Sequence, residues 1–213
     1  ILSPAMIIDY RSALFMQSTA TAVFNPNGNN MASSGFGVFS PIIFEAGGTY
    51  TLHDDLNIPS TDNRNHITIR GNTTLDANGY DVSAGTITLY DNVVFDMTGS
   101  AIITRNCCFG WQVKTETATL MTSGSIISTS EFEGGNAYTY NNVLLTRNNN
   151  TVIKYGNSTI EGVFTIDAVV TAATIRGGGM YNGPFIANNS GRTYLEGGKT
   201  FNNTVTINCP EFR

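Results

Sequence analysis

The residues whose types and spacing best suit chemistry are His53, Asp54 and Asp55. Adjacent carboxylates beside an imidazole are groups that a metal ion or an acid–base reaction uses. A glycoside hydrolase needs two carboxylates roughly 5–10 Å apart. A calcium-dependent lyase needs clustered acidic side chains. The three residues are therefore the candidate metal or catalytic site, and the alternative is a solvated turn.

Other polar residues form weaker patterns. Asp62, Arg64 and His66 make a second polar segment, with the same two alternatives. Four aspartates occur singly, without the Asp-x-Asp spacing of a calcium ladder: Asp76, Asp81, Asp91 and Asp96. The glycine run at 177–179 has no following aspartate, so the nine-residue calcium repeat is excluded. We predict no catalytic residue and no metal site or cofactor from these patterns.

Aromatic and sulfur-bearing residues are a further set of possible binding groups. Tyr138, Tyr155 and Tyr194 could stack on sugars, although packing at the corners of a repeat explains them more simply. The three cysteines, Cys107, Cys108 and Cys209, are odd in number and lack zinc-ligand spacing. Adjacent cysteines rarely bridge each other, so we expect all three to act as small buried apolar side chains.

Composition limits the classes of fold and partner. Charged residues make up only 13%, hydrophobic residues 41%, and there are 22 glycines. This balance is typical of an all-β protein with many tight turns rather than of disorder. The net charge is −5 and no basic run is present, so nucleic acid is not expected as a partner. No apolar stretch approaches the roughly 20 residues that span a bilayer.

A repeat of about twenty residues organises the chain. Each copy has an apolar anchor, two turn-like residues and an alternating apolar stretch. The six anchors are Leu52, Leu75, Tyr140, Ile160, Tyr181 and Phe201. A glycine lies four residues before five of them, at Gly48, Gly71, Gly156, Gly177 and Gly197, and Gly135 lies five before the sixth. A glycine at a fixed place in each copy indicates a corner with positive φ or close backbone approach.

This period predicts an all-β fold, a parallel β-helix or solenoid with coils of about twenty residues. We expect the six anchors to stack on one line, and Leu144, Phe164, Phe185 and Val205 to stack inside on another. Ten coils would give a rod roughly 45–50 Å long, with asparagine ladders along its turns. In this register His53, Asp54 and Asp55 fall where other coils carry Asn-Asn, which favours the solvated turn.

The expected organisation is a β-helix over residues 41–213 and an N-terminal coil or cap over 1–40. The segment after Ser3-Pro4 fits a capping helix or strands. Strands are expected at Val93-Val94-Phe95 and at Ile126-Ile127, with an irregular loop near 106–119. Both termini fall in ordinary repeat sequence, so we expect the chain to be a fragment of a longer protein.

Four phrases are similar to those of a known family. They are GTYTLHDDL at 48–56, TLDANGYDV at 74–82, EGGNAYTYNNV at 133–143 and KTFNN at 199–203. They resemble the large secreted β-helical surface proteins of Bacteroidota that the type IX system exports, including the giant adhesins of gliding flavobacteria. The likeness covers roughly residues 36 to 208. The sorting domain that usually ends these proteins is not in this chain.

The resemblance implies a non-catalytic, extracellular segment of a large cell-surface protein, either a gliding-motility adhesin or a surface filament. Its implied partners are neighbouring segments of the same protein or further copies stacked on it, together with surface glycans and the secretion machinery. Two alternatives from other classes remain open. One is a phage tail fibre or tailspike, and the other is a polysaccharide-degrading β-helix enzyme.

Overall fold

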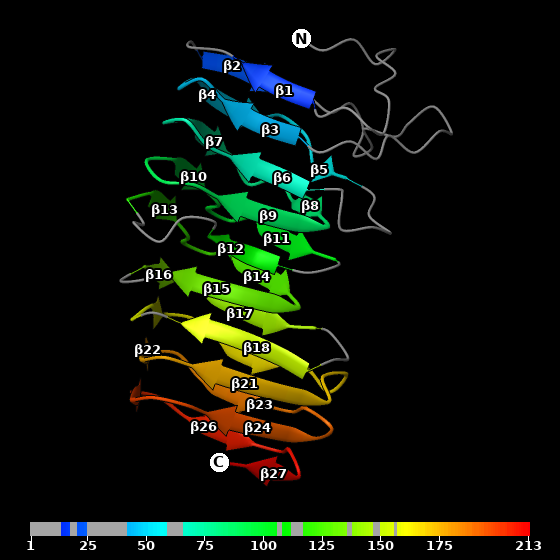
Figure 1. Cartoon of the computed structure of the whole chain (residues 1–213), viewed down its shortest axis with the longest axis vertical. Helices are drawn as coiled ribbons and strands as arrows, with labels where there is room; N and C mark the ends of the chain where they lie inside the picture. The colour runs from blue at the N-terminus through cyan, green and yellow to red at the C-terminus, as the bar shows by residue number, and fades with distance from the viewer. Residues whose placement is uncertain are drawn as a thin grey trace, which may run out of the picture.

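The computed structural model describes residues 14–17, 21–24, 42–58, 66–105, 108–111, 117–135, 138–146, 150–155 and 157–213. Within these ranges the chain consists of strands and turns, and no helix is long and apolar enough to cross a membrane. Every described strand pair is parallel, and successive coils stack along one axis (Figure 1). The predicted all-β parallel β-helix is therefore confirmed.

Each complete coil contributes one strand to each of three faces. The first face is a single ten-stranded sheet of β1 (Leu14–Gln17), β3 (Ile42–Glu45), β6 (His66–Ile69), β9 (Thr86–Leu89), β12 (Cys108–Trp111), β15 (Glu131–Gly135), β18 (Asn150–Tyr155), β21 (Ala172–Arg176), β24 (Arg192–Leu195) and β27 (Glu211–Phe212).

The second face is divided into two sheets. Five strands form the N-terminal part: β2 (Thr21–Phe24), β4 (Thr49–Leu52), β7 (Thr74–Asp76), β10 (Val94–Asp96) and β13 (Thr119–Met121). Four strands form the C-terminal part: β16 (Thr139–Tyr140), β19 (Thr159–Ile160), β22 (Gly179–Tyr181) and β25 (Lys199–Phe201).

The third face is an eight-stranded sheet of β5 (Leu56–Asn57), β8 (Val82–Ala84), β11 (Ala101–Thr104), β14 (Ile126–Thr129), β17 (Asn142–Leu145), β20 (Phe164–Ile166), β23 (Phe185–Ala187) and β26 (Val205–Ile207). The strands predicted at Val93-Val94-Phe95 and Ile126-Ile127 correspond to β10 and β14, so both are confirmed.

Alternating side chains from the three faces fill the core. Phe164 and Phe185 stack with ring centroids 5.4 Å apart on the third face, and both are fully buried. Tyr181 and Phe201 stack at 5.0 Å on the second face. The edge of Tyr181 meets Phe164 at 5.5 Å, which joins the two aromatic columns across the core. Such pairs add to the stabilisation that burial provides.

The anchor line is continuous through the C-terminal half. Tyr140, Ile160, Tyr181 and Phe201 are direct partners in successive strands. In the N-terminal half, Leu75 is paired with Tyr50 and with Phe95, and Leu120 follows. Leu52, by contrast, is paired with Phe24 and lies two residues beyond this line. The prediction was wrong at Leu52, although its side chain is buried in the core.

The inner line of the third face also differs from the prediction at one residue. Phe164, Phe185 and Val205 are in register, as predicted, but their partner in β17 is Val143. Leu144 pairs with Thr165 and lies on the outward side, half-buried. The corner before β17 is one residue shorter than the next corner, and a one-residue shift moves a strand's side chains to the opposite face.

Several corners use the predicted glycines. Gly71, Gly135, Gly177 and Gly197 have positive φ, as corner glycines should. At the first of these corners positive φ occurs at Ala46 and Gly47 rather than at Gly48. Gly156 lies outside the described residues. Tyr50 and Tyr140 stabilise the corner between the first and second faces, each in its own coil. Their hydroxyls donate to the carbonyl oxygens of Glu45 and Gly134, at 3.2 and 2.7 Å.

Parts of the predicted organisation fall on undescribed residues. The capping segment after Ser3-Pro4 and most of 1–40 lie outside the described ranges, and β1 and β2 are the described parts. Within the predicted irregular loop at 106–119, β12 belongs to the first sheet and β13 to the second. Residues 112–116 between them are outside the described ranges.

Candidate functional site

The aspartates singled out in the sequence join one coil to the next. The carboxylate of Asp55 accepts a hydrogen bond from the backbone N–H of Asp81 at 2.9 Å, across 26 residues. Asp81 in turn accepts from the N–H of Ala101 at 2.9 Å, across 20 residues. Asn142 repeats the arrangement and accepts from the N–H of Val163 at 2.9 Å. These side chains occupy the same position, at the entrance to the third face.

Other aspartates cap turns. Asp76 and Asp96 are register partners on β7 and β10. Each accepts from the N–H two residues ahead, that of Asn78 at 2.8 Å and that of Thr98 at 2.9 Å. Asp91 accepts from the N–H of Thr117 in the next coil at 3.3 Å. These carboxylates stabilise turns and coil contacts in the way Asx turns do.

This arrangement gives a first prediction. Asp81→Ala should lower the free energy of unfolding by about 1 kcal/mol, because the N–H of Ala101 loses its acceptor. Asp81→Asn keeps an acceptor oxygen, as Asn142 does, and should stay within about 0.5 kcal/mol of the parent. Urea denaturation followed by circular dichroism measures both. Equal losses for the two variants would contradict a hydrogen-bonding role.

The first candidate site does not gather into a cluster. His53 is exposed, and Asp54 turns back to accept from the N–H of Asp55 at 2.9 Å. His66 lies on β6 beside Thr86, whereas Asp62 and Arg64 lie outside the described residues. Among the residues that the structure describes, no three His, Cys, Asp or Glu side chains are close enough to hold a metal ion.

The candidate sugar-stacking tyrosines are engaged in contacts. Tyr138 packs against the core, and its hydroxyl accepts from the N–H of Ala118 at 3.2 Å. Tyr194 has the guanidinium carbons of Arg192 and Arg213 at 5.4 and 5.9 Å from its ring centroid. The side chain of Tyr155 lies outside the described residues. The described tyrosines therefore contribute to packing.

The cysteines differ from the expectation of small buried side chains. Cys108 is disulfide-bonded, and its sulfur lies 3.4 Å from Oε2 of Glu131. Cys209 is a free, half-buried thiol near the C-terminal end. Cys107 lies outside the described residues. The expectation was therefore wrong for Cys108.

Among the residues that the structure describes, Lys199 has a shifted pKa. Burial lowers the pKa of its amine, and Glu196 acts in the opposite direction. The amine donates to the carbonyl oxygens of Gly177 and Glu196 at 2.6 and 2.8 Å. Lys199 therefore holds together a corner where Gly177 and Gly197 both have positive φ.

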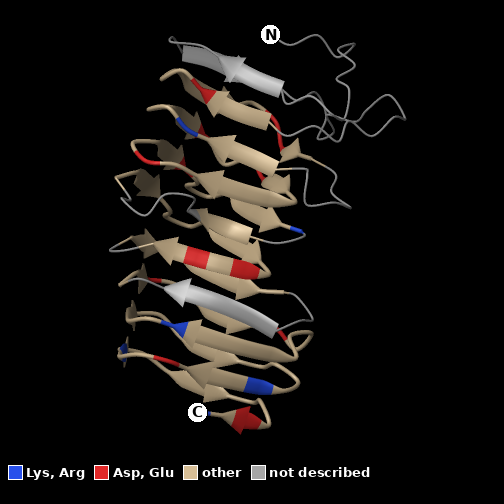
Figure 2. Cartoon of the chain, in the orientation of Figure 1, with Lys and Arg blue, Asp and Glu red and all other residues tan. Residues whose placement is uncertain are grey.

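The clearest candidate site was missed from the sequence. Glu131 and Glu133 lie on β15, one of the few strands with acidic residues on an otherwise sparsely charged surface (Figure 2). They border a hollow of about 170 Å³ on the first sheet, opposite Thr86 and Thr88. Gly110 also lines the hollow. A Cβ on Gly110 would lie 2.5 Å from the Cβ of Glu133, so the close approach of β12 and β15 here requires glycine.

The spacing of the two glutamates suits acid–base chemistry. Alternate residues of a strand point to one side and are about 7 Å apart, within the range that paired carboxylates use on a glycosidic bond. The alternation Glu131-Phe132-Glu133 could have indicated this pair. The hollow itself could not be predicted from the sequence. It depends on which residue of the preceding coil lies beside Glu133, and that residue is Gly110.

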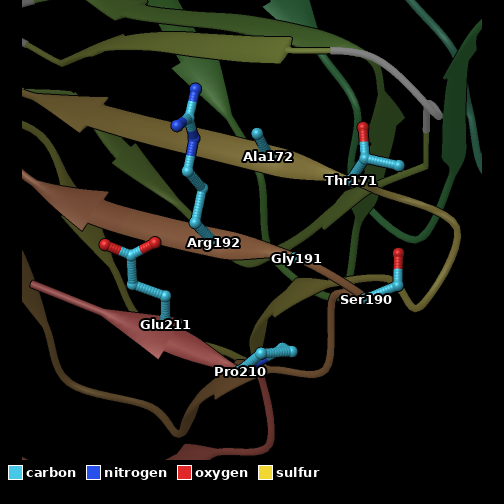
Figure 3. A pocket seen from close by; sticks show the side chains of 7 residues that line it. All are labelled: Thr171, Ala172, Ser190, Gly191, Arg192, Pro210 and Glu211. Atoms are coloured by element: carbon cyan, nitrogen blue, oxygen red, sulfur yellow. The ribbon is translucent and has the colours of Figure 1, made fainter.

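A second, larger hollow lies near the C-terminal end. It has a volume of about 380 Å³ and is lined by Thr171, Ala172, Ser190, Gly191, Arg192, Pro210 and Glu211 (Figure 3). Arg192 and Glu211 are register partners on β24 and β27. Glu211 also accepts from the hydroxyl of Tyr194 at 3.2 Å and pairs with Arg213 at 2.9 Å. The charged groups of the hollow are thus engaged by residues outside it, since Arg192 also lies over the ring of Tyr194.

In comparisons with known proteins, the chain matches no family model, no curated protein and no solved structure.

Proposed function

We propose that this chain is a non-catalytic structural and adhesive segment of a large extracellular, cell-surface protein, of the gliding-adhesin or surface-filament kind. Its partners would be neighbouring segments or further copies, surface glycans and the secretion machinery. The resemblance of its repeat phrases to type IX-exported proteins supports the location and the export route.

One observation carries the structural part of the proposal. Polar side chains that would serve a binding or catalytic site elsewhere connect adjacent coils here, from Asp55 through Asp81 and from Asn182 to Asn202. A stack joined on its faces by backbone hydrogen bonds and at its corners by side chains resists bending. It presents a long lateral surface with few charges, which suits a rod that extends from a cell surface and contacts other surfaces.

A retention assay tests the proposal. Beads coated with the chain should stay on polysaccharide-coated glass under flow more than beads coated with a globular protein of similar charge. No new reducing ends or unsaturated products should appear. Retention no greater than that of the control beads would contradict the adhesive function.

The hollow between Gly110 and the two glutamates favours one rival, a polysaccharide-degrading β-helix enzyme. If the chain released products from a polysaccharide, and Glu131→Gln or Glu133→Gln abolished that release, the rival would replace our proposal. Asp54→Ala and Asp55→Ala serve as controls, because those carboxylates serve backbone N–H groups at a turn.

A further inference from the structure

The outward side of the third face carries a line of alternating hydroxyl and aliphatic side chains. Strand register places one residue of each coil, from β8 to β23, directly beside the equivalent residue of the next coil. This outer line consists of Ser83, Ile103, Ser128, Leu144, Thr165 and Ile186. A hydroxyl alternates with an aliphatic side chain at every step, so the pattern repeats after two coils.

The alternation is not what packing between coils favours. Like side chains stabilise each other across adjacent strands, for example through hydrogen bonds between threonines. Elsewhere the chain follows that rule, because Thr104 donates to the hydroxyl of Thr129 at 2.6 Å and amide ladders join asparagines of successive coils. Within the outer line, no hydroxyl lies beside a hydroxyl and no aliphatic side chain lies beside another. A ligand whose own repeat spans two coils would account for the pattern.

The surface around the outer line is neutral. The other outward residues of β11, β14 and β17 are Ala101, Ile126 and Asn142, and none of them is charged. Ile126 is 38% exposed, and the members of the outer line from β11 to β23 are half-buried. A charged polymer would lose hydration on this face without gaining a counter-charge, so a neutral ligand suits it better.

An extended β-1,4-linked glycan has a matching repeat. Successive coils lie about 4.8 Å apart, so two coils span about 9–10 Å. Each sugar of such a glycan advances by nearly one coil, and alternate sugars are turned over. One edge of the glycan therefore presents ring hydroxyls and a hydroxymethyl group in turn, with the two-coil period of the outer line.

From these observations we propose that the outer line binds a neutral β-1,4-linked glycan laid along the rod. Ring hydroxyls of the glycan lie on the Ser and Thr members, which both donate and accept hydrogen bonds. Hydroxymethyl groups lie on the Ile and Leu members, which remove C–H surface from water. The inference rests on the proposed adhesive function, and it names the class of glycan and the face that binds it.

Isothermal titration calorimetry with cello-oligosaccharides tests the proposal. Cellohexaose should bind, and the affinity should rise with oligosaccharide length until the glycan covers the line from Ile103 to Ile186, roughly 20 Å. Maltohexaose contains the same sugar in α-1,4 linkage, which coils instead of extending, and it should bind more weakly. Equal affinities for the two hexasaccharides would overturn the match of repeats.

Two double variants break the alternation in opposite ways. Ser128→Leu/Thr165→Leu makes the line mainly aliphatic, and Leu144→Thr/Ile186→Thr makes it mainly hydroxyl-bearing. Both should weaken cellohexaose binding at least about tenfold, because each loses two matched contacts. Binding through apolar surface alone would instead strengthen in the first variant, and binding through hydroxyls alone would strengthen in the second. Either strengthening would overturn the proposal.

Matched controls make the same kinds of exchange on another face. Thr174→Leu on β21 and Ile43→Thr on β3 change half-buried, outward residues of the first face. Both should bind cellohexaose like the parent, and circular dichroism checks that all variants fold. Weakening by these controls as large as that in the double variants would show that the effect is not specific to the third face.

A combined variant reverses the order of the outer line and keeps its alternation. A glycan shifted by one sugar meets the same pattern, so the affinity should stay within about threefold of the parent. Loss of binding in this variant, once folded, would contradict recognition by alternation. The substitutions are Ile103→Ser, Ser128→Ile, Leu144→Thr, Thr165→Leu and Ile186→Thr.

The retention assay separates this inference from the proposed function. If the beads stay on polysaccharide-coated glass but cellohexaose does not bind, the outer line is the wrong site and the adhesive function stands. If the beads are not retained, the adhesive function itself fails. Self-association of the parent that both double variants abolish, measured by sedimentation velocity, would place a second copy on this face and overturn glycan binding there.

Discussion

Phe164→Asp should lower the free energy of unfolding by more than about 4 kcal/mol, because it removes a large buried side chain and buries an unpaired carboxylate. Phe164 is completely buried, stacks on Phe185 at 5.4 Å and meets the edge of Tyr181 at 5.5 Å. The loss therefore affects both aromatic columns. Urea denaturation followed by circular dichroism measures it, and an insoluble variant would be compared through Phe164→Leu.

The neighbouring residue provides the control. Thr165 lies on the same strand but points outward, between Leu144 and Ile186. Thr165→Asp places the same charge one residue further along and should cost less than about 1 kcal/mol. If Thr165→Asp were as destabilising as Phe164→Asp, the inward register of β20 would be wrong.

The repeat could be recognised from the sequence where the corners have nearly constant length. From Tyr140 to Phe201 the anchors recur every 20 or 21 residues, because stacked positions need similar side chains, and each anchor is paired with the next. Toward the N-terminus the separation between equivalent positions rises to 26 residues, as between Asp55 and Asp81. The extra residues fall between β5 and β6. They leave the alternation within each strand intact, so the alternation does not reveal that Leu52 lies two residues beyond the anchor line.

The candidate site was less predictable for a related reason. Alternation places Glu131 and Glu133 on one side of a strand, and this can be recognised within a single segment. To predict the hollow beside these glutamates, one must know which residue of the preceding coil lies next to Glu133. That residue is Gly110, and coil lengths vary too much here to identify it in advance. The role of Asp55 and Asp81 could not be predicted for the same reason. Their hydrogen-bond partners are backbone N–H groups one full coil away in the sequence.

Glycines at the corner between the second and third faces set how closely the coils approach. Gly183 is buried against the preceding coil, and a Cβ on it would overlap the carbonyl oxygen of Gly162. The clash is with backbone, which cannot rotate away. The coils would have to separate at this corner, although their backbone hydrogen bonds need a spacing of about 4.8 Å.

Gly183→Ala should therefore lower the free energy of unfolding by about 2–3 kcal/mol, as overpacking of a closed site does. Two other glycines distinguish a steric clash of the added Cβ from backbone strain as the cause of this loss. Gly198→Ala, with no atom within 4 Å, should be nearly neutral, and Gly79→Ala, with open space but a φ of 79°, should cost about 1 kcal/mol through strain alone. Hydrogen exchange should show the added loss at β23 and β26, which stack directly after this corner. Equal costs at all three glycines would mean that conformational freedom, rather than close approach, is what the corner requires.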